Sequence, residues 1–381
     1  MRLGDICTIV SGSTPKSNIP EYWDGTIKWI TPAELEQGTY IINDSVRHIT
    51  ELGVAKTGLK PFPQGTVILS SRAPIGKTAI AGCEMYCNQG FKNLICSDKI
   101  NPRYLYWFLT CNTEYLNSLG RGATFKEISK EIVADIEIPL PALDKQIAIA
   151  EKFEKISELI ALRKEQLAKL DQLVKSRFIE LFGDSVTNSM GWDTDTVIGV
   201  CDDIYGGGTP SKSHPEYYEN GDIPWVSSKD MKTDVLYDSQ IKINQLGLDN
   251  STAKMVPINS VIMVIRSGIL KHTLPIAINA VPITVNQDLK VFIPSKRILS
   301  IFLMYQFKML EKDILSGVRA VTADNIEFDS LKKREIIVPP MELQEQFATF
   351  VEQTDKSKLA IQQSLDKLEL LKKSLMQEYF G

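Results

Sequence analysis

Two long stretches of the chain carry apolar residues at spacings of three and four positions. The first, Leu143–Phe182, contains no glycine or proline, and the second runs over about 343–379. This spacing places the apolar side chains on one face of an α-helix. A pair of prolines stands just before each stretch, where proline is tolerated, and Gly183 follows the first. The pattern predicts two helices of roughly 35–40 residues, about 50–60 Å long at 1.5 Å per residue.

The rest of the chain is mixed in composition and contains short apolar runs rich in β-branched residues. Gly, Pro and Asn separate these runs, as is typical of strands joined by loops. We therefore expect short strands, with some helix such as 102–110. The clearest runs are 66–69, 79–81, 261–265, 276–278 and 291–293.

The chain also repeats itself. Residues 12–23 read GSTPKSNIPEYW and residues 207–218 read GGTPSKSHPEYY, with six of twelve positions identical. The offset stays between 194 and 200 residues for the other shared motifs, which are PQGTVILSSR with PINSVIMVIR (63–72, 257–266), NQxxK (88–92, 286–290) and SRFIELFG with SLMQEYFG (176–183, 374–381). Solenoid repeats have much shorter periods. The sequence thus indicates duplication of one unit of about 190 residues.

Duplication suggests how the long helices are accommodated. A helix of this length needs a partner for its apolar face, and the duplicate helix is the obvious one. Related by a pseudo-twofold axis, the two would run antiparallel and hold the globular parts at opposite ends. The alternative is that both are core helices of compact domains. A second apolar row favours further partner chains, and it consists of Leu159, Leu162, Leu173, Leu359, Leu370 and Leu371.

The composition is that of a globular protein of two or three domains, with 381 residues, 43% apolar and 24% charged. No apolar run reaches the ~18 residues that a membrane-spanning helix needs, and the first residues carry no apolar signal core. Six cysteines are scattered along the chain, which suits reduced thiols. We expect a cytoplasmic protein.

The formal charge of −4 argues against binding to nucleic acid by bulk positive charge. Residues 1–140 hold 14 basic and 14 acidic side chains, and residues 184–339 hold 16 and 19. Local basic loops remain possible, because charges act over a screening length of ~10 Å. Any binding to nucleic acid by the isolated chain is therefore expected to be weak.

Several motifs of enzymes are present only in part. SRAPIGKT at 71–78 ends like a phosphate-binding loop, but Ser71 replaces its first glycine and the next residues predict a strand instead of a helix. NPRY at 101–104 resembles the NPPY loop of amino-methyltransferases, although a turn with proline at the first helical position explains it better. The cysteines at 83, 87 and 96 lack a fourth zinc ligand, and the three histidines have no metal or nucleophile spacing.

The residues that recur in both copies are Gly, Pro, Thr, Asn, Gln, Arg and aromatics. Such residues suit turns and hydrogen-bonded recognition better than acid–base chemistry. Four repeated features together identify a known family: the paired loops at Gly12 and Gly207, the NQxxK motifs, the entries LPALDKQ and PPMELQEQ into the long helices, and the Phe-Gly endings. By these features the whole chain resembles the specificity (S) subunit of type I restriction–modification systems.

This resemblance implies an α+β fold of two mixed α/β target-recognition domains joined by two long antiparallel helices. The domains would be 1–140 and 184–339, and the spacer helices 141–183 and 340–381. Each domain would read one half of a bipartite double-stranded DNA site, and the helices would set the spacing. They would also dock two modification subunits, which methylate adenine with S-adenosylmethionine, and restriction subunits that use Mg and ATP could join. The chain itself would have no catalytic residues, no metal and no cofactor.

We expect the DNA contacts in polar loops and at strand ends. Hydroxyl groups, Lys and Arg suit phosphates and base edges. Turn formation is the alternative role for the Thr-Pro loops, and a structural salt bridge is the alternative role for the two matched arginines. Identical Asn-Gln pairs in two readers argue for a structural or shared backbone role. The candidate residues are Ser13, Thr14, Lys16, Arg72, Lys77, Lys92, Arg121 and Lys126 in the first copy, and Thr209, Ser211, Lys212, Arg266, Lys271, Lys290 and Arg319 in the second.

Two other functions compete with this interpretation. A methyltransferase or NTPase acting alone would need the incomplete loops at 71–78 or 101–104 to work. A duplicated coiled-coil scaffold would read no nucleic acid.

Overall fold

The computed structural model describes residues 1–381 except 37, 73, 123–125, 317–318 and 321–323. Contacts divide the chain into two units. Unit 1 contains 1–164 and 363–381, and unit 2 contains 165–362. Each unit therefore includes one half of each long helix, α6 (Leu143–Phe182) and α11 (Met341–Phe380), which confirms the two long helices expected from the apolar spacing.

Unit 1 is built around a five-stranded sheet with strand order β1-β8-β5-β6-β3, in which only the β3–β6 pairing is parallel. A smaller sheet, β4-β2-β7, stands beside it. The strands are β1 (Cys7–Val10), β2 (Trp23–Ile30), β3 (Ile41–Ile42), β4 (Arg47–Ile49), β5 (Val67–Leu69), β6 (Thr78–Ala81), β7 (Tyr86–Cys87) and β8 (Asn93–Cys96). The helices are α1 (Leu3–Ile6), α2 (Glu51–Thr57), α3 (Pro102–Cys111), α4 (Thr113–Ser118) and α5 (Lys130–Asp135), with 3-10 turns η1 (Pro20–Tyr22) and η2 (Pro32–Glu34).

Unit 2 repeats this architecture. Its main sheet has the order β10-β17-β14-β15-β12, with the same single parallel pairing at one edge, and its smaller sheet is β13-β11-β16. The strands are β9 (Thr194–Thr196), β10 (Cys201–Gly206), β11 (Ile223–Val226), β12 (Val235–Leu236), β13 (Lys242–Ile243), β14 (Val261–Val264), β15 (Ile276–Asn279), β16 (Thr284–Val285), β17 (Leu289–Pro294), β18 (Arg319–Ala320), β19 (Asp324–Asn325) and β20 (Glu335–Ile337). The helices are α7 (Gln245–Asp249), α8 (Ser300–Met309), α9 (Glu311–Ser316) and α10 (Phe328–Lys332), with 3-10 turns η3 (Pro215–Tyr217) and η4 (Gly268–Lys271). The duplication read from the sequence is thus a duplication of topology.

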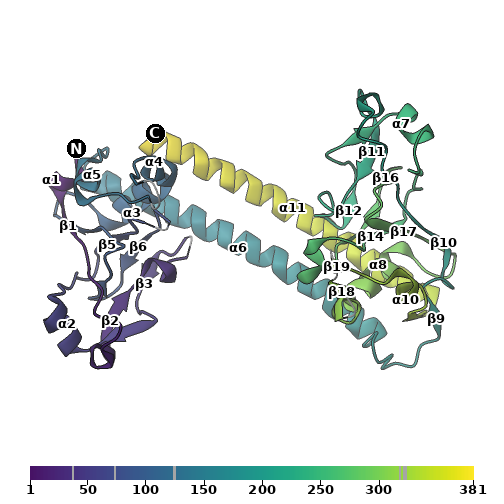
Figure 1. Cartoon of the computed structure of the whole chain (residues 1–381), viewed down its shortest axis with the longest axis horizontal. Helices are drawn as coiled ribbons and strands as arrows, with labels where there is room; N and C mark the ends of the chain where they lie inside the picture. Colours follow the sequence, from purple (N-terminus) through teal and green to yellow (C-terminus); the bar gives the residue numbers. More distant parts are fainter. Residues whose placement is uncertain (37, 73, 123–125, 317–318, 321–323) are drawn as a thin grey trace. The chain divides into compact units, whose positions relative to one another are not determined.

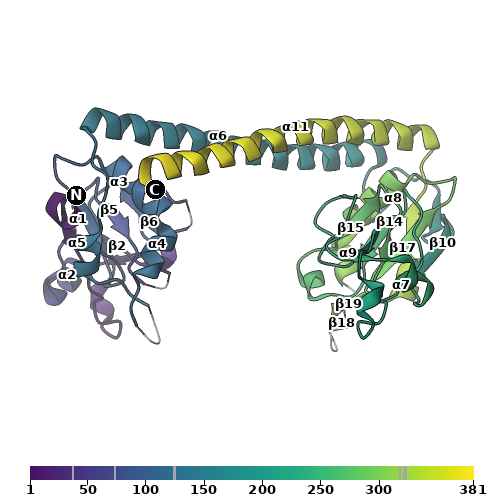
Figure 2. The same ribbon diagram turned by 90° about the horizontal axis from the view of Figure 1, so that it is seen from above.

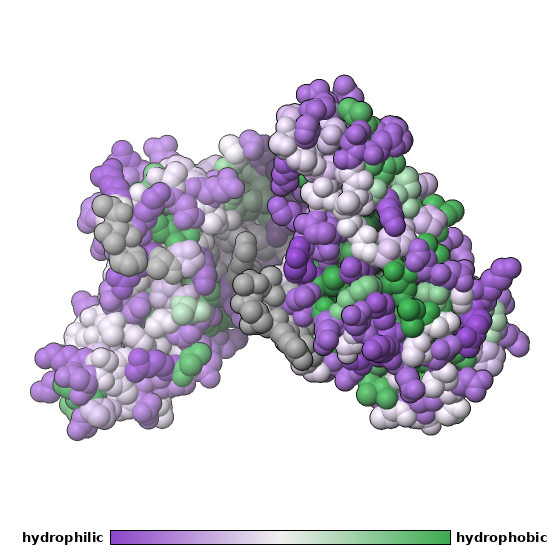
Figure 3. Space-filling view, turned by 45° about the vertical axis from the view of Figure 1, so that its right-hand side comes forward, coloured by the Kyte–Doolittle hydropathy of each residue, from purple (hydrophilic) through white to green (hydrophobic). Residues whose placement is uncertain are grey.

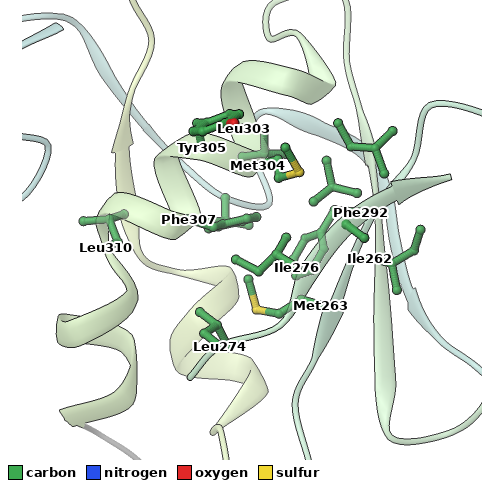
Figure 4. Close-up of a cluster of buried hydrophobic side chains, with 14 of the residues drawn as sticks. Ile262, Met263, Leu274, Ile276, Phe292, Leu303, Met304, Tyr305, Phe307 and Leu310 are labelled. Carbon is green, nitrogen blue, oxygen red and sulfur yellow. The ribbon is translucent and has the colours of Figure 1, made fainter. Parts of the chain in front are cut away.

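Within each unit a short helix lies between the main sheet and the long helices (Figures 1 and 2). In unit 1 this is α3, which begins with Asn101 as N-cap and Pro102 at its first turn, as expected. In unit 2 it is α8, whose Met304 and Phe307 pack near Ile276 and Phe292 of the sheet (Figure 4). An apolar helix can be buried on both sides in this way, so the sheet and the long helices share one core.

The halves of the long helices pair antiparallel within each unit. In unit 1, Phe153 of α6 stacks on Phe380 of α11 with ring centroids 5.5 Å apart, and Lys372 Nζ donates to Ser157 Oγ at 2.9 Å. In unit 2, Phe178 and Phe347 meet edge to face at 5.3 Å. The residue numbers rise on one helix as they fall on the other, which confirms the predicted antiparallel arrangement in both units.

In each unit a buried glutamine joins the globular part to the start of a long helix. Gln146 Oε1 accepts from Asn101 N at 2.8 Å, and Gln146 Nε2 donates to Lys99 O and Pro141 O at 3.1 and 2.8 Å. Gln344 makes the same three bonds 198 residues later, with Leu299 N, Arg297 O and Pro339 O. Because both amides are fully buried and fully bonded, they fix the helix start against the turn before α3 or α8.

The charged residues between domain and helix differ in the two units. In unit 1, Glu154 accepts from Arg103 and Tyr40. Burial raises the pKa of Glu154, but these hydrogen bonds outweigh it and hold that pKa below its ordinary value.

In unit 2, Lys358 Nζ lies 2.6 Å from Asp171 Oδ1 and 3.5 Å from Asp355 Oδ1, while Lys308 pairs with Asp234 at 2.5 Å. Burial raises the pKa of Asp355, and its ion pair with Lys358 opposes this shift only in part. The pKa values of Glu154 and Asp355 are therefore shifted in opposite directions.

Candidate nucleic-acid interface

In unit 1, two loops far apart in sequence are held together. Ser13 N donates to Cys87 O at 3.0 Å, and Thr14 Oγ1 donates to Gln89 Oε1 at 2.6 Å. The indole Nε1 of Trp29 donates to Ser13 O at 3.0 Å. A Cβ on Gly12 would overlap the carbonyl oxygen of Cys87, so only glycine allows this close approach.

Unit 2 contains the same assembly at the matched positions. Gly208 N donates to Val285 O at 3.0 Å, and Thr209 donates to Gln287 Oε1. Trp225 Nε1 donates to Gly208 O at 2.9 Å. The repeated GxTP and NQ motifs thus form one interlocked pair of loops in each domain, and we call it the loop pair.

The loop pair exposes donors. Its Gln89 and Gln287 are exposed, and because the threonine hydroxyl donates to the amide oxygen, the amide nitrogen is the group that can donate to a new acceptor. Lys16 and Lys212 are exposed beside it, and Ser211 is exposed and bonded to Ser213 at 2.7 Å. The visible surface of unit 2 is largely hydrophilic, with scattered hydrophobic side chains (Figure 3). Such a surface suits phosphate oxygens and base edges.

The asparagines of the NQ motifs have a structural role. Asn88 Oδ1 accepts from Gly90 N at 2.9 Å, and Asn286 Oδ1 accepts from Asp288 N at 3.1 Å. Both side chains therefore close a turn on their own backbone. This geometry favours the structural alternative for the asparagines and leaves the neighbouring glutamines as the better candidates for contact.

One acidic position in each copy was missed by sequence reasoning. Glu34 accepts from Thr31 N at 2.8 Å and from Val46 N at 2.7 Å, and Asp230 accepts from Ser227 N and Gln240 N, both at 2.9 Å. These carboxylates tie a second loop to the turn that follows Trp29 or Trp225. The common pattern is Trp, an aliphatic residue, a hydroxyl residue and, three positions later, an acid (29–34 and 225–230), and it could have been read from the sequence.

The strand-end cations of unit 1 lie next to the loop pair. Lys92 is buried, with its Nζ 3.1 Å from Glu127 Oε1 and 3.3 Å from Ser71 Oγ. Arg72 forms a backbone bridge with Glu127, and a Cβ on Gly90 would lie 3.4 Å from Arg72 Nε, so the guanidinium stands beside the NQ turn. The backbone of Arg121 pairs with Glu127 through two bonds of 3.0 Å.

The corresponding residues of unit 2 occupy the same backbone positions with other partners. Arg266 Nε and Nη2 lie 2.7 and 2.6 Å from Asp288 Oδ1. Lys290 Nζ lies 4.4 Å from the ring centroid of Phe328, and burial lowers its pKa, with Lys332 adding to the shift. Arg266 bridges Asn325, whereas Arg72 bridges Glu127.

The remaining candidates are spread around these clusters. Lys77 is half-buried and donates to Pro32 O at 3.3 Å, Lys126 and Lys271 are exposed, and Arg319 lies in β18, the counterpart of the Arg121 segment. These placements bring Ser13, Thr14, Arg72 and Lys92 together in unit 1, and Thr209, Arg266 and Lys290 in unit 2. Whether any of them touches DNA stays a prediction.

The incomplete phosphate-binding motif does not form a nucleotide loop. Thr78–Ala81 is the buried strand β6, as expected, so no helix N-terminus follows Gly76 and Lys77. These residues line a cavity of about 250 Å³ together with Tyr106 and Thr113. Among the described residues no cluster of three or more His, Cys, Asp or Glu could hold a metal ion, and the six cysteines are free thiols.

Comparison with known proteins decides the family. The family described as "Type I restriction modification DNA specificity domain" matches residues 1–172 and again residues 190–371. The chain belongs to this family. It is 30% identical over 372 residues to the type I restriction enzyme MjaIX specificity subunit of Methanocaldococcus jannaschii, covering 92% of this chain and 85% of that protein.

Other relatives agree. The EcoR124I/EcoR124II specificity subunit of Escherichia coli is 31% identical over 261 residues, which are 66% of this chain and 62% of its own. The solved S subunit from M. genitalium covers 100% of this chain and 95% of its own, with TM-score 0.61 and 15% identity, and thus shares the fold. A chain solved in work on complex assembly and conformational transition of the type I R-M system gives TM-score 0.63 at 20% identity, covering 100% of this chain and 96% of its own.

This membership confirms the resemblance read from the motifs. The chain is the component of a type I restriction–modification system that supplies DNA sequence specificity, and it is not the catalytic component. Its two copies of the specificity domain fit a bipartite site. Specificity subunits of these systems assemble with other subunits and with DNA. Among the described helices, none is long and apolar enough to cross a membrane.

Proposed function

We propose that each domain binds its half-site through the face that carries the loop pair. The observation that supports this most directly is the repetition of one backbone frame with different side chains around it. A reader of two different half-sites needs a constant scaffold and variable contacts. The loop pair provides the constant part, with Thr14, Gln89 and Lys16 serving the first half-site and Thr209, Gln287 and Lys212 making equivalent contacts to the second. The side chains that differ around the two loop pairs would distinguish the half-sites.

We further propose that two modification subunits dock on the long helices. Leucines of the second apolar row support this, because Leu162 and Leu370 in unit 1 are 45% and 69% exposed, and Leu359 in unit 2 is 60% exposed. The partner subunits would carry S-adenosylmethionine, and restriction subunits would bring Mg and ATP. The working complex would be cytoplasmic.

Methylome sequencing of cells that express the chain with its modification subunit tests the proposal. We expect one split motif with two defined halves and methylated adenine. Replacing residues 12–16 by the sequence of 207–211 should then change the defined bases of one half and leave the other half intact. An unchanged motif after this exchange would show that the loop pair does not read DNA.

The competing functions have a direct test of their own. The purified chain is expected to bind neither S-adenosylmethionine nor ATP in calorimetry, since the motif that ends at Thr78 leads into strand β6 instead of a helix and Asn101 caps helix α3. It is also expected to bind DNA weakly without its partners. Tight binding of a nucleotide or of S-adenosylmethionine by the chain alone would favour a stand-alone enzyme.

A further inference from the structure

Each domain carries two cations and one carboxylate beside its loop pair. In unit 1 they are Arg72, Lys92 and Glu127, and in unit 2 they are Arg266, Lys290 and Asp288. The arginines match each other in the repeat, and so do the lysines. The carboxylates do not match, because Asp288 stands where unit 1 has Gly90, and Asn325 stands where unit 1 has Glu127.

Because the carboxylates stand at different positions, they pair with different cations in the two units. In unit 1 the carboxylate neutralises the lysine, and Arg72 has no ion pair among the residues that the structure describes. In unit 2 the carboxylate neutralises the arginine, and Lys290 has an aromatic ring beside it instead of a carboxylate. The three side chains sum to +1 in each domain, but the uncompensated charge is a guanidinium in one and an ammonium in the other.

Arg72 and Lys290, which have no carboxylate partner among the described residues, differ in what they can recognise. A guanidinium offers a planar fork that fits the O6 and N7 acceptors of guanine or two phosphate oxygens. Arg72 is positioned for this use, since its Nε lies close to Gly90 in the turn that carries the exposed Gln89. Arg266 is half-exposed, but its Nε and Nη2 are already bonded to Asp288, whose other oxygen accepts from Asn286 Nδ2 at 3.1 Å.

We infer that Arg72 contacts DNA and contributes to base specificity in the first domain, whereas Arg266 is a positioning residue that holds the second NQ turn. Lys290, close to Phe328, supplies a point charge to the second domain. This inference rests on the proposed function of the loop pair. It assigns different roles to two residues that occupy the same place in the repeat.

The test compares Arg72→Ala with Arg266→Ala in the complex with the modification subunits. Binding is measured for duplexes carrying the full motif, the motif with either half scrambled, and no motif. We expect Arg72→Ala to weaken binding to the full motif by roughly 10- to 100-fold and to abolish the penalty for scrambling one half. Arg266→Ala should change affinity less than about threefold and keep both penalties.

A conservative variant separates base contact from charge. Arg72→Lys keeps the charge but loses the fork, so it should retain the salt dependence of binding while losing discrimination at one half-site. Thermal unfolding of each complex shows whether Arg72→Ala is folded, and Arg72→Gln replaces it if it is not. Releasing Arg266 by Asp288→Ala should make a subsequent Arg266→Ala substitution costly to binding.

Two outcomes overturn the inference. One is an equal loss from Arg72→Ala and Arg266→Ala, and the other is a larger loss from Arg266→Ala. If exchanging residues 12–16 for the sequence of 207–211 leaves the methylated motif unchanged, then the proposed function of the loop pair itself is wrong, so the two failures can be told apart.

Discussion

The two recognition domains share their backbone bonds and differ in their ion pairs. Trp29 and Trp225 hold equivalent loop carbonyls, and the buried glutamines make three equivalent bonds each. In contrast, the lysine of one domain and the arginine of the other carry the carboxylate partner. Hydrogen bonds to the main chain therefore define the frame of both domains, while the side-chain charges around it are free to differ.

The largest expected effect concerns the shared part of the frame. Gln146→Ala and Gln344→Ala should each lower the free energy of unfolding of their unit by about 3 kcal/mol, because each removes a buried amide and leaves backbone groups without partners. Urea unfolding followed by tryptophan fluorescence, with hydrogen exchange to locate the loss, measures this. The exposed Gln346→Ala is the control and should change stability by less than about 0.5 kcal/mol. Unequal losses of unfolding free energy from Gln146→Ala and Gln344→Ala would contradict the claim that the two units share one frame.

A smaller effect should distinguish the domains. Glu127→Asn leaves the buried Lys92 without its ion pair and should destabilise unit 1 by about 2 kcal/mol. Asn325→Ala, at the matched position of unit 2, removes no ion pair and should cost less than about 0.5 kcal/mol. Hydrogen exchange of β8, which follows Lys92, and of β17, which contains Lys290, provides the measurement. A similar cost for both variants would contradict the exchange of partners.

The smallest expected effect is on the pH dependence of stability, to which Glu154 and Asp355 at the helix junctions contribute with opposite signs. The pKa of Glu154 is lowered in the folded state, so its contribution is present above its ordinary value of 4.5 and is lost as pH falls through the folded pKa. The pKa of Asp355, which faces Lys358, Asp234 and Lys308, is raised above 3.8, so its ionised form costs stability that returns as pH falls through the raised value.

At pH 7, Glu154→Gln should therefore destabilise unit 1, and Asp355→Asn should stabilise unit 2, each by less than about 1 kcal/mol. Both differences should shrink when urea unfolding is repeated near pH 3.5. Effects of the same sign in the two variants at pH 7 would show that the junctions are electrostatically alike.

Much of the fold could be predicted because it depends on patterns along the chain. The apolar spacing defined α6 and α11, the β-branched runs defined β5, β6, β14, β15 and β17, and Asn101-Pro102 defined the start of α3. The paired loops were visible as repeated motifs. Their physical connection through Thr14 and Gln89 was not, because it joins residues 75 positions apart.

The ion pairs could not be predicted for a similar reason. The sequence shows that Gly90 is replaced by Asp288 and Glu127 by Asn325, but not which cation each carboxylate faces. From the sequence, Arg72 and Arg266 could each form either a structural salt bridge or a contact with DNA. The structure assigns a salt bridge to Arg266 and leaves Arg72 without one among the described residues.

The hydrogen bonds of the two indole groups have a consequence for how the sequence of such a protein can evolve. The indole groups of Trp29 and Trp225 each donate a hydrogen bond to a backbone carbonyl oxygen, which every amino acid has, and this bond does not involve the side chain of the accepting residue. A Cβ on Gly12, Gly207 or Gly208 would overlap backbone atoms of a facing segment, so these three positions are excluded from variation. Ser13, whose carbonyl Trp29 binds, can be substituted without loss of that hydrogen bond. Substitutions that alter DNA recognition can then accumulate with little loss of folding stability.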